Sequence, residues 1–353
     1  MSGTSLDGLD IAYCEFENKA AWSYKIGHAT TIKYTKAWKQ KLGGAIGLNK
    51  QELRDLDIEF GKFIGAETLK FIKAKRLKAD LIASHGHTVF HQPEKGITLQ
   101  IGSGKHISAA TKLTVVCDFR SGDVALGGQG APLVPLVDKL LFSDYTFCLN
   151  LGGFANISYE KGGKRIAFDI CAVNIILNDL AGRLGKEFDR GGRIASKGKM
   201  HPGLLKELNA LPFFRAKPPK SLGREWVETS FLPLVDSFNI PVQDKLRTLV
   251  EHVAIQISGA VNSLPLTSSS KLLVTGGGAY NAFLIGRITF HTKCLVVLPD
   301  DRTIQFKEAI AFAFLGLLKW KGEINILKSV TGAKTNSSGG KIYIPDQNAE
   351  SSV

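Results

Sequence analysis

Alternating apolar and polar residues predict that the chain begins with strands. Residues 9–16 alternate as a half-buried strand does, and residues 22–33 continue the same meander. Residues 50–79 carry apolar side chains at helical intervals among charged ones, which predicts one or two helices. Residues 80–84 and 114–117 are short apolar runs that predict buried strands, each followed by polar residues. The carboxyl ends of such strands are the usual place for a ligand site in an open α/β sheet.

The second half of the chain repeats this order of elements. Apolar runs predict strands at residues 147–151, 155–159, 165–168 and 271–275, and helical periodicity marks residues 177–184, 250–261 and 308–320. Residues 262–270 are expected to form a loop, and residues 336–353 a weakly structured tail. A strand, a glycine-bearing turn and a returning strand thus occur near residue 5 and again near residue 152. This repetition predicts two similar α/β halves.

Length and composition describe an ordinary soluble protein of about two domains. The chain has 353 residues, of which 44% are hydrophobic and 22% charged. Lys and Arg number 45 against 32 Asp and Glu, and the net charge of +13 favours anionic ligands without choosing among them. No apolar run is long enough to span a membrane, and the basic stretch at residues 70–78 lacks interleaved aromatic residues, so neither membrane nor nucleic acid is expected as a partner.

The cysteines and the N-terminus indicate where the protein works. Five cysteines, an odd number with wide spacing and no Cys-x-x-Cys pair, predict free thiols in a reducing compartment. The first residues lack the basic start and apolar stretch of a signal peptide. We therefore expect a cytoplasmic protein.

Three glycine-bearing segments are candidate nucleotide sites. Gly3-Thr4-Ser5-Leu6-Asp7-Gly8 offers hydroxyls and backbone N–H groups to phosphate, and Asp7 can reach a hydrated Mg²⁺, although the same composition is typical of an exposed turn. A second turn, at Gly152 and Gly153, is expected to face the first, with a triphosphate between the two hairpins. Residues 276–278 join a strand to a helix through three glycines, which suits either close approach to a ligand or helix packing. Neither a dinucleotide fingerprint nor a Walker loop is present.

Polar residues after the predicted strands are candidates for catalysis and substrate binding. Asp169 follows one strand and precedes a helix, where it can act as a general base or only cap the helix. Arg120 lies in a glycine-rich loop and can bind a carboxylate, or form an internal ion pair with Asp118. His85 and His87 follow another strand, where hydrogen bonding to a polar ligand or to each other is favoured over zinc, because no Cys or carboxylate cluster stands at ligand spacing.

These motifs, taken together and in order, resemble the anhydro-N-acetylmuramic acid kinase family over nearly the whole chain. The matching segments are residues 1–8, 84–86, 118–120, 127–135, 151–156, 219–225, 276–279, 307–309 and 330–333. The resemblance implies an α/β fold of two ribonuclease-H-like lobes of the actin, hexokinase and Hsp70 type, with ATP in the interlobe cleft. We place the N-terminal lobe at residues 1–140 and the C-terminal lobe at residues 141–353.

The resemblance also implies a reaction and a set of site residues. Kinases of this family use Mg-ATP and water to open the 1,6-anhydro ring of anhydro-N-acetylmuramic acid and phosphorylate O6, giving N-acetylmuramic acid 6-phosphate for cell-wall recycling. By this resemblance Asp169 deprotonates the attacking water, and His85, Arg120 and Glu308 contact the sugar. The ATP contacts are carried over to Gly3, Thr4, Ser5, Leu6, Asp7, Gly8, Leu9, Asp10, Gly152, Gly153, Gly276, Gly277 and Gly278, with Asp7 reaching a metal ion through water.

Two departures from the family pattern keep other functions open. Family members commonly carry strand residues before the segment that here begins at Met1, so we expect the start of translation to lie upstream. Residues 170–173, Ile-Cys-Ala-Val, replace a stretch that commonly holds glycine and proline. The alternatives are a non-catalytic, ATP-dependent binding protein on the same fold and a kinase for another amino sugar. The resemblance also implies a homodimer.

Overall fold

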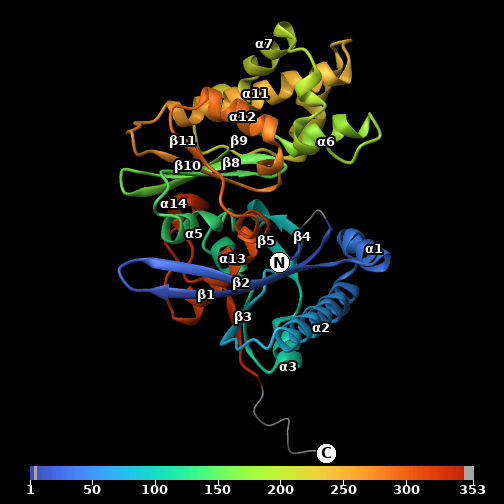
Figure 1. Cartoon of the computed structure of the whole chain (residues 1–353). Helices are drawn as coiled ribbons and strands as arrows, with labels where there is room; N and C mark the ends of the chain where they lie inside the picture. Colours follow the sequence, from blue (N-terminus) through green and yellow to red (C-terminus); the bar gives the residue numbers. More distant parts are fainter. Residues whose placement is uncertain (4–5, 346–353) are drawn as a thin grey trace, which may run out of the picture. The chain divides into compact units, whose positions relative to one another are not determined.

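The computed structural model describes residues 1–3 and 6–345, and the chain divides into two compact units (Figure 1). Unit 1 comprises residues 1–141 and 306–353, and unit 2 comprises residues 142–305. The described residues from 306 to 345 group with unit 1. The division into lobes at residues 1–140 and 141–353 stays a prediction.

Unit 1 is built from short sheets and flanking helices. Its strands are β1 (Gly8–Asn18), β2 (Trp22–Lys33), β3 (Leu81–Ala83), β4 (His87–Gln92), β5 (Ile97–Ile101), β6 (Thr114–Cys117) and β12 (Lys341–Tyr343). Its helices are α1 (Lys36–Gly44), α2 (Lys50–Ala74), α3 (Gly104–Thr111), α4 (Ser121–Ala125), α5 (Val134–Leu141), most of α13 (Asp301–Trp320), and α14 (Lys328–Thr331). The predicted helical region 50–79 is one helix, α2, which begins with a capping box of Asn49 and Glu52.

The sheets of unit 1 do not join into one. Among the strands of the described residues, β1 pairs with β2, β4 pairs with β5, and β3 lies at the edge of the order β12-β6-β3. Ser2 forms single bridges to Leu9 of β1 and His87 of β4. A cavity of about 380 Å³ lies beside β1 and β3, and its lining includes Ile11 and Ile82. The core of the unit lies under α2, around Phe60, and reaches Val115 of β6.

Unit 2 contains a continuous sheet of five strands with helices packed against it. The strand order is β11-β10-β7-β8-β9, antiparallel between β7, β8 and β9 and parallel between β7, β10 and β11. The strands are β7 (Phe147–Leu151), β8 (Phe154–Lys161), β9 (Lys164–Ala172), β10 (Lys271–Thr275) and β11 (Leu295–Val297). The helices are α6 (Asn174–Gly182), α7 (Pro202–Ala210), α8 (Pro212–Arg215), α9 (Arg224–Trp226), α10 (Leu232–Asp236), α11 (Val242–Asn262) and α12 (Ala282–His291). Residues 227–231, between α9 and α10, form a π-helical turn.

The eight predicted strand runs are all present, as β1, β2, β3, β6, β7, β8, β9 and β10. β4, β5, β11 and β12 are additional strands. β12 lies in the segment expected to be weakly structured, where it pairs antiparallel with β6. All five cysteines are free, and Cys117, Cys148 and Cys171 are buried. In the described residues, no helix is both long and apolar enough to cross a membrane.

Candidate active site

Asp169 stands in a row of polar residues that crosses three strands of unit 2. Asn150 of β7 pairs with Asn156 of β8, and Asn156 pairs with Asp169 of β9. Residues directly opposite each other on neighbouring strands present their side chains on the same face of a sheet. The register shifts immediately after this row, because Ala155 pairs with Cys171 and leaves Ile170 as an extra residue. Such a bulge re-aims the neighbouring side chains and is common beside active sites.

The loop that contains Lys220, Ser221 and Leu222 holds Asp169. The Asp169 amide donates to the Lys220 carbonyl at 3.1 Å. The carboxylate oxygen Oδ2 accepts from the Ser221 hydroxyl and from the Leu222 amide, each at 2.9 Å. In the described part of the chain, Oδ1 accepts no hydrogen bond. Burial raises the pKa of Asp169, while the two donors oppose this rise by stabilising the anion. A half-buried carboxylate with one oxygen tied down and the other free is suited to accept a proton.

The glycine turn at Gly152 and Gly153 is attached to the start of α6. The Gly153 carbonyl accepts from the amides of Val173 and Ile175, and the Gly152 carbonyl accepts from the amide of Asn174. The side-chain amide of Asn174 donates to the Leu151 carbonyl at 3.0 Å. The turn therefore satisfies N–H groups that the first turn of a helix leaves unpaired.

The three glycines at 276–278 pack against the end of β7. Gly276 has φ +82°, and a Cβ there would lie 2.5 Å from Asn150 Oδ1. A Cβ on Gly278 would lie 2.6 Å from Leu151 Cβ, whereas the nearest atom to one on Gly277 is Asn174 Nδ2 at 3.7 Å. A side chain at Gly276 or Gly278 would therefore clash with the end of β7. Gly277 is exposed, and it is the member of the run whose backbone is open to a ligand.

In unit 1, Gly8, Leu9 and Asp10 are the first residues of β1, and Gly3, Leu6 and Asp7 precede the strand. Thr4 and Ser5 lie outside the described residues. Leu6 has φ +57° and its amide donates to the Gly3 carbonyl, while the side chain of Asp7 is exposed. Gly8 and Leu9 have structural roles. A Cβ on Gly8 would lie 2.5 Å from the Ile32 carbonyl oxygen, and Leu9 is buried in the core. The Asp10 carboxylate accepts from the Thr31 hydroxyl, and burial raises its pKa.

His85 and Arg120 are in contact, at the ends of β3 and β6. Arg120 donates to His85 Nε2 from Nε at 3.1 Å and from Nη2 at 3.0 Å, and from Nη1 to the Gly130 carbonyl at 2.7 Å. Because Nε2 accepts, the ring proton of His85 is on Nδ1, which faces the Gly86 carbonyl at 3.2 Å. Burial and the guanidinium charge hold the pKa of His85 well below its ordinary value. Both ring nitrogens are used within the protein, so His85 orients Arg120.

Arg120 is also supported by a buried aspartate. Asp123 is fully buried and its carboxylate accepts from the Gly130 amide at 2.7 Å and the Thr331 hydroxyl at 2.8 Å. The glycine-rich loop at residues 127–132 and the segment at residues 330–333 are thereby joined around one carboxylate. Asp118 pairs with Lys341 at 2.8 Å, so the alternative of an Asp118–Arg120 pair is not what is found.

Glu308, on α13 in the same unit, lies in the electrostatic field of Arg120. Desolvation raises the pKa of Glu308, and the positive charges of Arg120 and of the chain's amino terminus oppose the rise. Desolvation also lowers the pKa of Arg120 to about 10. The two groups thus influence each other electrostatically, and their side chains are suited to bind a carboxylate and hydroxyl groups of a ligand.

The histidines do not gather metal ligands. His87 Nδ1 lies 3.1 Å from the Ser2 hydroxyl, which also accepts from Tyr34. Within residues 1–3 and 6–345, no group of three His, Cys, Asp or Glu side chains is arranged to hold a metal ion. A hydrated Mg²⁺ carried by ATP needs fewer protein ligands than such a cluster, and the exposed Asp7 carboxylate is compatible with one contact through water.

Comparison with known proteins assigns the chain to a family. A model of the family described as anhydro-N-acetylmuramic acid kinase matches residues 1–345. The chain belongs to this family. Curated relatives named anhydro-N-acetylmuramic acid kinase include one from Mannheimia succiniciproducens, 35% identical over 97% of both chains, and one from Pseudomonas fluorescens, 36% identical over 97% of this chain and 98% of the relative. A relative of the same name from Bacillus cereus is 33% identical over 98% of each chain.

Likeness to solved structures is weaker. The activator of 2-hydroxyisocaproyl-CoA dehydratase from Clostridium difficile, solved with bound ADPNP, aligns with 64% of this chain and 86% of its own at 14% identity and a TM-score of 0.38. The resemblance to the anhydro-N-acetylmuramic acid kinase family is confirmed by the sequence relatives, and the α/β class is confirmed by the two units described above.

The altered stretch after Asp169 is accommodated in this family member without glycine. Ile170 is the extra residue of the bulge, and the side chains of residues 170–173 are buried in the core of unit 2. None of these residues has a positive φ. Val173, with φ −130° and ψ −94°, then leads into α6. The stretch therefore makes the turn without a residue in the left-handed region that favours glycine.

Sequence reasoning missed the residues that hold Asp169. The segment at residues 219–225 was recognised only as part of the family pattern, without a role. Ser221 and Leu222 are more than fifty residues from Asp169 in the chain, so neither spacing nor periodicity signals the contact. The signal available was the segment itself, a Pro-Lys-Ser-Leu-Gly run of polar and turn-forming residues between helices.

Proposed function

We propose that this protein is an ATP-dependent kinase that hydrolytically opens the 1,6-anhydro ring of anhydro-N-acetylmuramic acid and phosphorylates O6. The product is N-acetylmuramic acid 6-phosphate, with ADP released. The observation that carries the proposal is the Asp169 carboxylate, fixed through Oδ2 and free at Oδ1, in a member of a family whose curated relatives are named for this kinase activity.

In the proposed reaction, Oδ1 of Asp169 accepts a proton from water as the water oxygen attacks the anomeric carbon. The bond from that carbon to O6 breaks, and the electron pair leaves with O6. O6 takes the γ-phosphoryl group of ATP, which supplies the phosphoryl chemistry when bound, and ADP keeps the electron pair of the broken bond. Positioning and proton acceptance are the protein's main contributions to such a transfer.

The remaining residues have proposed binding roles. Arg120, oriented by His85, binds the lactyl carboxylate of the sugar, and Glu308 accepts hydrogen bonds from sugar hydroxyls. Backbone N–H groups between Gly3 and Gly8, apart from that of Leu6, and those of Gly152 and Gly153 contact the phosphates, and Gly277 allows close approach of the adenosine. Asp7 is proposed to contact Mg²⁺ through water.

ADP release tests this function. The wild-type protein is expected to release ADP from Mg-ATP only when 1,6-anhydro-N-acetylmuramic acid is present. Asp169→Asn removes the base with little change in shape, so turnover should fall by a factor of about 10² to 10⁴ while ATP binding is retained. Asp144→Asn is a control, because Asp144 is an exposed aspartate of the same unit. Wild-type turnover by Asp169→Asn contradicts the assigned role.

The alternatives predict different results in the same assay. A non-catalytic binding protein releases no ADP with the anhydro sugar, and a kinase for another amino sugar releases ADP only with another member of a substrate panel. The family relationship does not favour either. We further propose a homodimer located in the cytoplasm, where ATP is available, and sedimentation equilibrium measures the oligomeric state directly.

A further inference from the structure

The Asp169 carboxylate is asymmetric in its surroundings. Both donors near it, the Ser221 hydroxyl and the Leu222 amide, bond to Oδ2 at 2.9 Å. In the part of the chain that the structure describes, no donor bonds to Oδ1. A carboxylate oxygen that accepts two hydrogen bonds is a weaker proton acceptor than its free partner oxygen, because a proton there would displace one of them.

The loop that supplies these donors is anchored away from the carboxylate. Lys220 donates from its amino group to the Phe213 carbonyl at 3.1 Å, and that amino group lies 4.4 Å from the centre of the Phe213 ring. Leu222 is buried, and the backbone carbonyl of Lys220 accepts from the Asp169 amide. The loop thus contacts Asp169 at its backbone and at its side chain, so both the position and the rotation of the carboxylate are determined.

We propose that Ser221 is a positioning residue that, with the Leu222 amide, occupies Oδ2 of Asp169 and so leaves Oδ1 as the single oxygen that takes the proton from the attacking water. This inference rests on the proposed function. The side chain of Ser221 is exposed and contributes no apolar packing, which separates its effect on the carboxylate from an effect on folding.

The role has a signature in the pH profile. The Ser221 hydroxyl stabilises the charged form of Asp169, so its removal raises the pKa of the base. In Ser221→Ala the acidic limb of the kcat/KM profile for the sugar should therefore move to higher pH by about one unit, with about a tenfold loss of activity on that limb. The KM for ATP should be unchanged. Ser221→Thr keeps the hydroxyl and should restore the wild-type profile.

The control is Ser263→Ala, which removes an exposed hydroxyl of the same unit that donates to the Ala260 carbonyl, far along the chain from the loop. Its pH profile should match wild type. An unchanged profile in Ser221→Ala overturns the inference, and so does an equal loss of kcat at all pH values accompanied by faster hydrogen exchange throughout unit 2, since that result indicates a structural role. Asp169→Asn, measured alongside, distinguishes the proposed function from the role of Ser221. If Asp169→Asn is inactive while Ser221→Ala is normal, only the proposed role of Ser221 is wrong.

Discussion

The sheets of the two units differ in continuity. In unit 2 the five strands β11-β10-β7-β8-β9 pair without interruption, and most residues of β7 and β10 are buried. In unit 1 the pair β1-β2 and the set β12-β6-β3 are separate, and a cavity of about 380 Å³ lies beside β1 and β3. Strand edges without a partner leave backbone donors and acceptors unpaired, and a cavity removes packing contacts. The comparison indicates that the sheet is continuous in the unit that holds Asp169 and interrupted in the other unit.

The first prediction tests this difference with one substitution in a strand of each unit. Ile157 of β8 is 1% exposed, whereas Ile82 of β3 lines the cavity of unit 1. Ile157→Ala should lower the free energy of unfolding of unit 2 by about 4 kcal/mol, because the closely packed core cannot fill the space. Ile82→Ala should cost unit 1 roughly half as much, since its side chain already borders empty space. Hydrogen exchange followed by mass spectrometry reports each unit separately, and equal losses would remove the distinction.

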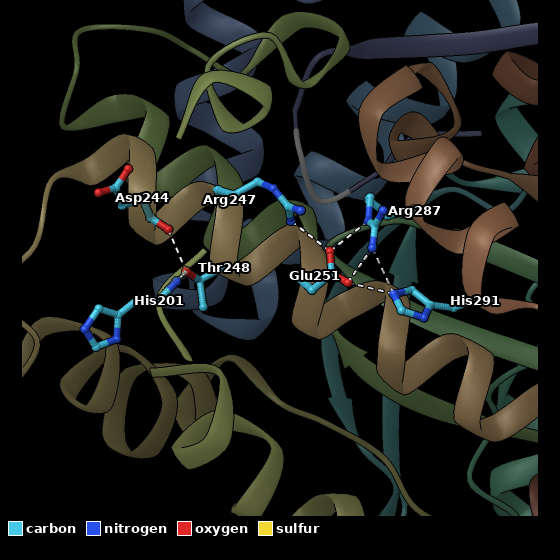
Figure 2. Close-up of polar contacts among 7 residues, drawn as sticks. All are labelled: His201, Asp244, Arg247, Thr248, Glu251, Arg287 and His291. Carbon is cyan, nitrogen blue, oxygen red and sulfur yellow. Dashed lines mark hydrogen bonds and ion pairs between the residues drawn. The ribbon is translucent and has the colours of Figure 1, made fainter. Parts of the chain in front are cut away.

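The second prediction concerns the polar contacts that join α11 to α12 in unit 2. Glu251 is buried and accepts from Arg247 at 2.8 Å, from two nitrogens of Arg287 at 2.8 and 2.7 Å, and lies 2.6 Å from His291 Nε2 (Figure 2). Although burial opposes it, these partners lower the pKa of Glu251 from 4.5 to about 2. Glu251→Gln should therefore lower the free energy of unfolding by about 3 kcal/mol at neutral pH, because two guanidinium groups lose their counter-charge.

The pH dependence of this loss follows from the direction of the pKa shift. A carboxylate with a lowered pKa in the folded state stabilises fully above its unfolded pKa, and the stabilisation is lost as pH falls through the folded value. The difference between wild type and Glu251→Gln should be constant above about pH 4.5 and shrink between pH 4.5 and 2. Urea unfolding at several pH values measures it. Glu228→Gln, which alters the exposed pair with Arg224, is the control and should cost less than about 1 kcal/mol.

Local patterns predicted much of this fold, and long-range contacts account for the rest. The alternation in β1 and β2 and the apolar runs of β7 and β10 identified strands because each pattern is complete within the segment. β12 was missed because three residues in a polar tail become a strand only by pairing with β6, more than 200 residues earlier. The grouping of residues 306–345 with unit 1 depends on the same kind of contact.

The residues of the candidate site could also be predicted from local patterns, but their contacts could not. Asp169 was identified from its place after a strand and from the family pattern, and the segment around Arg120 from its polar, glycine-rich composition. The bond from Arg120 to His85, and that from Thr331 to Asp123, join segments whose separation in the chain carries no signal. Sequence patterns therefore named the polar residues, but not which of them orient the others.

The last prediction tests the same difference between the two sheets by adding a strand beside β1 of unit 1. Met1 and Asp10 exchange two backbone hydrogen bonds of 2.8 Å, and the amino group of Met1 borders the cavity, where burial lowers its pKa. In this antiparallel register, a residue added before Met1 lies opposite Ile11. An N-terminal extension of about seven residues that alternate Val and Thr should therefore run along β1 beside the cavity, and raise the free energy of unfolding of unit 1 by about 2 kcal/mol.

The stabilisation should come from strand pairing, and a matched extension tests that cause. The same seven residues with two of them replaced by proline cannot complete the backbone hydrogen bonds of a central strand, so this extension should leave the stability of unit 1 unchanged. Hydrogen exchange should slow in β1 and β3 with the first extension only, and remain unchanged in unit 2 with both. Equal protection by the two extensions would mean that removing the buried charge of the Met1 amino group, which both share, is what stabilises the unit. The continuity of the sheet would then not be the property that distinguishes the two units.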